Sequence, residues 1–153
     1  MIKKLGSLLS FLASSATGST APKDQEINFS KAEGWTIESK RPFLIVSESG
    51  EAMIEELQLD QKFQNEALDF VNYIVTTAHH KQFGGEPSAA TEVNGENWNG
   101  YLQSQPGGIG GYEFQLVARS GGKTYVFYLA LPELPNEPDM QKYRDLILSL
   151  KVS

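Results

Sequence analysis

The side chains that most often carry acid–base or nucleophilic chemistry are few in this sequence. His79 and His80 are its only histidines, and it has no cysteine. Neighbouring residues of a helix point about 100° apart, so these two imidazoles cannot chelate one metal ion as an i, i+4 pair can. We expect them instead to complement the negative end of a helix dipole. A serine hydrolase is not indicated, because its base would have to be one of these two residues.

Acidic side chains gather along one predicted hairpin and are the second candidate for chemistry. They are Glu48, Glu51, Glu55, Glu56 and Asp60. Paired carboxylates can hydrolyse glycosides, and clustered oxygen ligands can bind calcium, but this spacing matches no calcium loop. Most of the five are therefore expected at solvated strand and turn positions. Glu55 is the exception, since its strand face is apolar and its charge would need a partner such as Lys40, Arg41 or Arg119.

Two glycine-bearing stretches contain parts of a phosphate-binding loop without completing it. They are residues 106–111 and Gly122-Lys123-Thr124. The motif needs a glycine five residues before its Gly-Lys-Thr unit, where this chain has Val117, and a helix after it, where a strand is predicted. Both stretches are therefore predicted to be hairpin connections. Three aromatic residues, Trp98, Tyr101 and Tyr112, flank the first stretch and either form an exposed contact surface or pack in the core.

Composition and charge narrow the class of protein and its partners. The chain has 153 residues, of which 40% are hydrophobic and 21% charged, and this suits one soluble globular domain. The absence of cysteine excludes disulfides, thiolate zinc sites, iron–sulfur clusters and cysteine nucleophiles. The formal net charge of −6 argues against nucleic-acid binding, which depends on lysine and arginine at the phosphate backbone. We expect no nucleic-acid partner, no metal and no cofactor.

The first 21 residues are typical of a secretory signal peptide. Two lysines precede an apolar run over residues 5–13, and small and polar residues follow. The apolar stretch is shorter than the roughly twenty residues that a membrane-spanning helix needs, and no cysteine follows it for lipid attachment. We expect residues 1–21 to be a signal peptide and residues 22–153 to be a single periplasmic or secreted domain with no stable membrane anchor. A cytoplasmic domain with an ordinary amphipathic or disordered N-terminal segment is the alternative.

From Glu26 onward the pattern predicts strands, a helix, more strands and a closing helix. Short extended pieces lie on either side of Glu33-Gly34, and Ser49-Gly50 turns a strand at 42–47 into its partner at 52–60. The clearest helical periodicity covers residues 65–83. Its apolar stripe consists of Ala67, Phe70, Val71, Ile74 and Ala78, and Gly84-Gly85 offers a stop.

Residues 88–131 predict four antiparallel strands in two hairpins. Asn94-Gly95 most readily forms a type I′ turn, so we expect it to join the strands at 88–93 and 96–104. Ser120-Gly121-Gly122 should join the strands at 112–119 and 123–131, whose apolar residues alternate. Pro138 is placed to open a last helix that runs to Leu150.

This order of elements predicts an α+β fold in which an antiparallel sheet of about six to seven strands packs against two helices. We expect the helices to cover the apolar face of the sheet. The opposite face should be solvent-exposed or used for binding. It carries Gln103, Glu113, Gln115, Arg119 and Tyr128.

Several of these features together resemble the PsbP-like superfamily. They are Gly34-Trp35 after a short first strand, Val93-Asn94-Gly95 leading to Trp98, the Gly-Gly hairpin into Tyr125-Val126-Phe127, and a final helix ending Ile147-Leu148-Ser149-Leu150. The resemblance spans about residues 27–152. That superfamily includes extrinsic photosystem proteins, a yeast factor that binds the GTPase Ran, DcrB-like envelope proteins and chaperones of type VI secretion effectors. It implies an α/β/α sandwich used for binding rather than catalysis, and the missing lipid-bearing cysteine separates this chain from the lipoprotein branch.

These observations favour a non-enzymatic binding or accessory protein of a bacterial cell envelope that recognises another protein. The contact would involve the exposed sheet face and the loop at 106–111, with Trp98, Tyr101, Gln103, Tyr112 and Gln115 as candidate binding residues. A small-ligand carrier with a pocket between the sheet and the helix at 65–83 is the first alternative. An acid–base hydrolase that uses Glu55 or Glu56 is the second.

Overall fold

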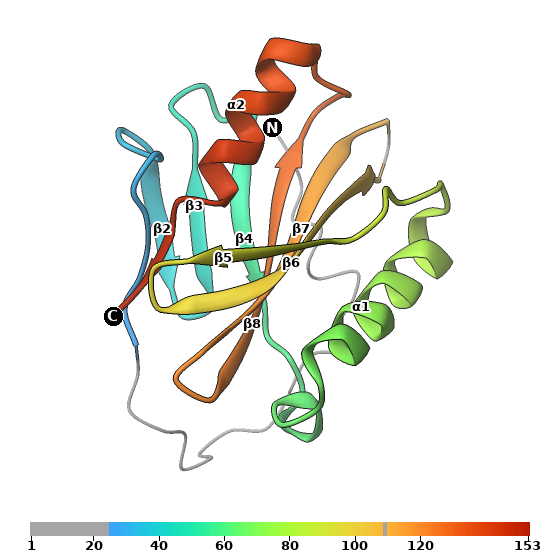
Figure 1. Ribbon diagram of the computed structural model, residues 1–153. Coiled ribbons are helices and arrows are strands. Elements are labelled where there is room, and N and C mark those ends of the chain that lie inside the picture. Colours follow the sequence, from blue (N-terminus) through green and yellow to red (C-terminus); the bar gives the residue numbers. More distant parts are fainter. Residues whose placement is uncertain (1–24, 109) are drawn as a thin grey trace.

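The computed structural model describes residues 25–108 and 110–153 (Figure 1). The predicted signal peptide at residues 1–21 lies outside them. The described elements, in chain order, are β1 (Ile27–Phe29), β2 (Thr36–Lys40), β3 (Phe43–Val46), β4 (Met53–Leu57), the short 3-10 helix η2 (Gln61–Phe63), α1 (Leu68–Phe83), β5 (Thr91–Gly95), β6 (Trp98–Pro106), β7 (Tyr112–Ser120), β8 (Lys123–Leu131), α2 (Glu137–Ile147) and β9 (Leu150–Val152).

Seven of these strands form one antiparallel sheet, in the order β2-β3-β4-β8-β7-β6-β5. The pairing of β4 with β8 joins the three strands that precede α1 to the four that follow it. β1 and β9 form a separate antiparallel pair. The predicted α+β class, with six to seven antiparallel strands and two helices, is confirmed.

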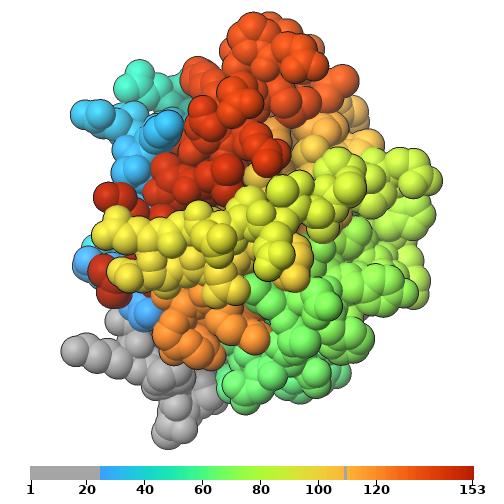
Figure 2. Space-filling model, in the orientation of Figure 1, coloured from blue at the N-terminus to red at the C-terminus, as the bar shows by residue number. Residues whose placement is uncertain are grey.

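The two helices lie on opposite faces of the sheet. Val71 and Val75 of α1 share a core cluster with Val117 of β7, whereas Ile147 of α2 shares another with Leu116 of the same strand. Since Leu116 and Val117 are neighbours on a strand, their side chains point to opposite faces. In Figure 2 the β5–β6 hairpin crosses the molecule between α2 above and α1 below. The fold is a helix–sheet–helix sandwich.

The polar sheet face is buried, contrary to the prediction. Its residues Gln103, Glu113, Gln115 and Tyr128 are at most 5% exposed, because α1 covers them. α1 brings polar side chains of its own, Asn72, Thr76 and His79, to meet them. A row of polar residues on a strand therefore indicated a matching polar stripe on the helix rather than contact with water.

α1 begins three residues later than predicted and turns a slightly different side to the sheet. The preceding residues form the 3-10 helix η2, which Asp60 caps by accepting a hydrogen bond from Lys62 N at 3.2 Å. The buried side chains of α1 are Leu68, Val71, Asn72, Val75, Ala78 and His79, whereas Phe70 is 45% exposed. The predicted end is confirmed, since the helix stops at Phe83 and Gly84 takes a positive φ of 70°.

One hairpin turn matches the prediction and one does not. Ser120 pairs with Lys123, and both glycines between them have positive φ, as a type I′ turn requires. In the other hairpin Gly95 pairs with Trp98, so the turn is Glu96-Asn97 and the predicted turn is wrong by two residues. Gly95 has a packing role instead, because a Cβ atom there would collide with the Trp98 indole.

The last helix is shorter than predicted. Pro138 lies in its first turn as expected, but α2 ends at Ile147 rather than at Leu150. The residues that follow form β9, which pairs Leu150 with Phe29 of β1. The alternating burial of Leu150–Val152 is the strand signal that the helical interpretation missed.

Candidate functional site

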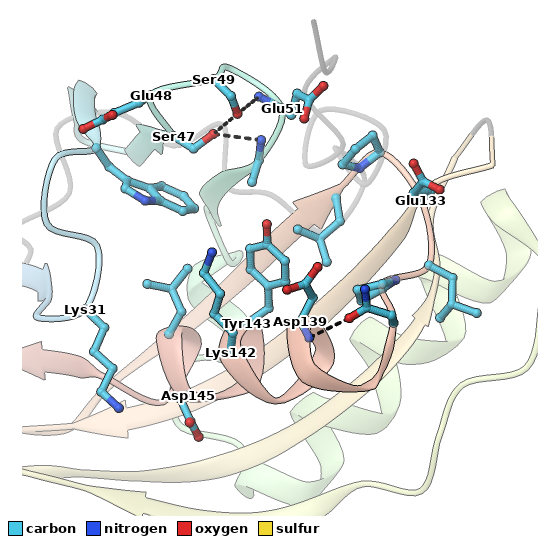
Figure 3. Close-up of a pocket in the computed structure, with 18 of the residues that line it drawn as sticks. Lys31, Ser47, Glu48, Ser49, Glu51, Glu133, Asp139, Lys142, Tyr143 and Asp145 are labelled. Atoms are coloured by element: carbon cyan, nitrogen blue, oxygen red, sulfur yellow. Dashed lines mark hydrogen bonds between the residues drawn. The ribbon is translucent and has the colours of Figure 1, made fainter.

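A cleft of about 1070 Å³ opens on the α2 side of the sheet (Figure 3). Its walls come from parts of the chain that are far apart in sequence: the β1–β2 loop, the tip of the β3–β4 hairpin, the segment between β8 and α2, and α2 itself. We call it the acidic cleft. Its charged lining residues are Lys31, Glu33, Glu48, Glu51, Glu133, Asp139, Lys142 and Asp145.

The cleft also has an apolar lining that connects to the core. Leu131 and Leu146 are buried beneath it, and Trp35 and Tyr143 are half-buried and pack against the same core cluster. Leu134, on the segment that leads into α2, is 61% exposed. Aromatic and aliphatic side chains of this kind offer contact area to a ligand at little further cost in conformational entropy.

Negative charge dominates the cleft. Six carboxylates face two lysines, an excess of four negative charges, whereas the whole chain carries a net charge of −6. Among the residues that the structure describes, no salt bridge joins a cleft carboxylate to a basic side chain. Lys142 lies over the ring of Tyr143, with Nζ 5.4 Å from its centroid. Like charges in a concave surface reinforce one another, so the cleft presents a negative potential to solvent.

Hydrogen bonds from backbone amides to two serine hydroxyls hold the hairpin wall of the cleft in place. Ser47 Oγ accepts from Ala52 N at 3.1 Å, and Ser49 Oγ accepts from Glu51 N at 3.3 Å. Gly50 closes the tip with a φ of 77°, a left-handed conformation that favours glycine. These contacts fix the positions from which Glu48 and Glu51 reach the rim (Figure 3).

The opposite wall is one face of α2. Asn136 caps the helix by accepting from Asp139 N at 2.9 Å. Asp139, Lys142, Tyr143 and Leu146 then follow at helical spacing, so all four share the side that lines the cleft. The cap and the periodicity of a single helix therefore place an acid, a base and an aromatic ring side by side.

The predicted binding residue Trp98 lies in the core. It is 5% exposed, and its Nε1 donates to Leu150 O at 2.8 Å, which ties β6 to β9. Tyr101 and Tyr112 are half-buried, and Tyr112 donates its hydroxyl to Ser104 Oγ at 2.8 Å. Tyr101 packs toward α1 and Trp98 toward α2. The three aromatic residues do not form one contact surface, and none of them lines the acidic cleft.

The other two predicted binding residues, Gln103 and Gln115, belong to a closed ring of four amides. Asn72 donates to Gln103, Gln103 to Gln105, Gln105 to Gln115 and Gln115 back to Asn72, over 2.9 to 3.1 Å. Gln115 also donates to Thr76 Oγ1. Each amide thus donates and accepts inside the ring, so these buried polar groups bond to one another.

His79 is the partner of a buried acid rather than a complement to the helix dipole. Its Nε2 contacts Glu113 Oε1, and both side chains are at most 2% exposed. Burial raises the pKa of Glu113, and the hydrogen bond and charge of His79 oppose that rise. Burial and the charge of Glu113 raise the pKa of the neighbouring Tyr128 well above its usual range. The signal for this role was present in the sequence, since His79 lies four residues after Val75 on the buried stripe of α1.

Glu55 and Glu56 are not arranged as a catalytic pair. They are neighbours on β4, so their side chains point to opposite faces of the sheet. Glu56 accepts a hydrogen bond from Phe43 N at 3.0 Å. Burial raises the pKa of Glu56, and this hydrogen bond partly offsets the rise. Glu55 is 9% exposed, and Arg119, one of its predicted partners, donates instead to Thr124 and to backbone carbonyls. Neither carboxylate lines the acidic cleft.

Comparison with known proteins gives no relative: no family model, curated protein or solved structure matches this chain. Within the described residues, no helix is long and apolar enough to cross a membrane. The same part of the chain contains no group of three or more histidines and acids that could hold a metal ion.

Proposed function

We propose that this protein is a non-enzymatic binding protein that recognises another protein through the acidic cleft. One observation carries the proposal: carboxylates that form no salt bridge within the described part of the chain surround a floor of half-buried aromatic and exposed aliphatic side chains. An apolar centre with a polar rim is the usual anatomy of a protein interface, and tryptophan and tyrosine often dominate its energetics. The surface differs from the sheet face and loop that the sequence favoured, because Gln103, Gln115 and Trp98 are buried in the fold.

Affinity capture with a cleft variant tests this proposal. Leu134→Ser combined with Tyr143→Ser removes two apolar side chains of the lining, and Phe70→Ser on the exposed side of α1 is the matched control. A partner from the native host should bind the wild type and the control and be lost from the cleft variant. A partner that the cleft variant retains, at unchanged stability, would contradict the proposal.

A small-ligand carrier is the second candidate, and the size of the cleft favours it. Pockets for small molecules measure about 300–1,000 Å³, which is close to the volume found here. The pocket would lie beside α2 and not under α1, where buried side chains meet. Native mass spectrometry of freshly purified protein separates the candidates, since a carrier retains a small molecule that a protein-binding cleft lacks.

We also propose that the protein is exported and is related to the PsbP-like superfamily. The helix–sheet–helix sandwich agrees with the architecture that the resemblance implies. The mature N-terminus, determined on protein from the native host, tests export. We expect the mature protein to begin near residue 22. A mature protein that begins at Met1 would favour the cytoplasmic alternative.

A further inference from the structure

The chemistry of the acidic cleft also indicates which kind of partner fits it. We propose that it binds a cationic, partly apolar peptide segment of another protein, in which lysine or arginine side chains meet the carboxylates and an apolar side chain contacts the floor. This inference rests on the proposed function and names the class of its partner.

Carboxylates stand on both walls of the cleft and favour a cationic partner. Glu48 and Glu51 stand on the hairpin wall, Glu133 and Asp139 stand on the opposite wall, and the space between them is open (Figure 3). None of these carboxylates has a cationic partner among the described residues. An anionic or wholly apolar segment would remove water from them without replacing its hydrogen bonds, which costs free energy. A segment with cations at two separate positions would satisfy both walls.

The aromatic and aliphatic floor of the cleft favours a partner that is also partly apolar. Trp35 and Tyr143 are half-buried between the two walls, and Leu134 is 61% exposed at the end near Glu133. The face of an aromatic ring attracts a lysine or arginine head group, as Lys142 over Tyr143 already illustrates. The aliphatic part of such a side chain, or a neighbouring leucine, suits the same apolar surface. A bare metal cation would use neither the aromatic floor nor Leu134.

The size of the cleft favours a peptide segment over an ion. A volume of about 1070 Å³ is large for a single ion and lies just above the range of about 300–1,000 Å³ for small ligands. The walls come from four separated segments of the chain, so the negative charge is spread along the opening. An extended peptide can span such an opening, so that its cations reach the two walls and an apolar side chain contacts the floor.

Trp35 provides an internal reporter for the test. The chain has two tryptophans, and the other, Trp98, is buried away from the cleft. We would titrate the full-length protein with a short peptide of alternating lysine and leucine while recording tryptophan fluorescence. Matched peptides replace every lysine with glutamate, or every leucine with serine. The lysine–leucine peptide should bind at least about tenfold more tightly than either, and added salt should weaken it.

Charge-neutralising variants locate the binding. Glu48→Gln, Glu51→Gln and Glu133→Gln together should weaken the lysine–leucine peptide by about tenfold or more. The control variant, Glu66→Gln with Glu86→Gln and Glu92→Gln, changes the net charge equally at exposed positions outside the cleft and should bind as the wild type does. Trp35→Phe should remove the fluorescence change.

Three results of the peptide titrations would contradict the inference, each for a different reason. Equal binding of the glutamate–leucine peptide, or of spermidine in place of any peptide, would show that the cleft does not select a cationic apolar segment. Equal loss in the cleft variant and in its control would show that net charge alone attracts the peptide. Any of these results leaves the proposed function standing if Leu134→Ser with Tyr143→Ser still abolishes capture of the partner, and both proposals fail if it does not.

Discussion

The two faces of the sheet place polar side chains in opposite environments. Under α1, four amides and the His79–Glu113 pair are buried and bond to one another. Beside α2, six carboxylates surround an open cleft without salt bridges among the described residues. Polar groups that satisfy each other contribute to stability and specificity of packing, whereas polar groups left facing solvent around an apolar floor are available to a ligand. The two groups of polar residues therefore differ in burial and in bonding partners.

The largest effect should follow from breaking the buried ion pair. Glu113→Ala leaves His79 under α1 without its partner, and loss of one member of a buried pair costs about 3–5 kcal/mol. Urea unfolding should show a fall of that order in the free energy of unfolding. The double variant Glu113→Leu with His79→Leu should recover much of the loss, since no charge then remains. A fall below about 1 kcal/mol in the single variant would mean that the pair is not buried as described.

Opening the amide ring should have the next largest effect. Asn72→Ala removes a donor to Gln103 and an acceptor from Gln115, and each buried polar group left unsatisfied costs about 1–3 kcal/mol. Asn65→Ala, at an exposed position before α1, is the control and should change stability by less than about 0.5 kcal/mol. Equal effects of the two substitutions would indicate that the ring does not stabilise α1 against the sheet.

The pH dependence of stability distinguishes a buried carboxylate from an exposed one. The pKa of Glu56 is raised in the folded state by burial, so the folded protein holds its proton to higher pH than the unfolded chain does. The charge of Glu56 therefore lowers stability as pH rises from 4.5 through the raised pKa, and the loss is complete above it. Glu56→Gln removes this titration, so the variant should gain stability relative to the wild type across that interval. Glu48→Gln, in the exposed cleft, is the comparison, and an equal gain there would contradict the assignment.

The smallest effect on stability should come from the cleft itself. Leu134→Ser replaces a side chain that is 61% exposed, and surface substitutions of this kind shift the free energy of unfolding by less than about 0.5 kcal/mol. Thermal unfolding should give a melting temperature close to that of the wild type. A loss above about 1 kcal/mol would assign Leu134 to the core and remove it from the proposed interface.

Local patterns in the sequence were sufficient for most of the fold. The Gly121-Gly122 turn, Pro138 at the start of α2 and the long helix ending at Phe83 were all predicted, because each depends on residues close in the chain. The turn at Glu96-Asn97 was missed because the packing of Trp98 over Gly95, a contact with the core, selects the register. The strand at Leu150–Val152 was missed because its partner lies at the other end of the domain.

The acidic cleft could not be predicted in the same way. Glu48 and Glu51 were noted as acidic, but Glu33, Glu133 and Asp139 come from three other segments that only the tertiary structure brings together. Conversely, Gln103 and Gln115 were wrongly predicted at a binding surface, since both are buried. Alternation along a strand shows which residues share a face, but it does not show what covers that face.

Hydrogen exchange of the full-length protein with and without its ligand tests the central claim most directly. With the lysine–leucine peptide, or with a partner captured from the host, we expect added protection in residues 47–52 and 131–146, which form the two walls of the acidic cleft. Unchanged exchange is expected in α1 and in the loop at 106–108. Protection confined to α1 or to that loop would contradict the account and restore the sheet face beneath α1 as the binding surface.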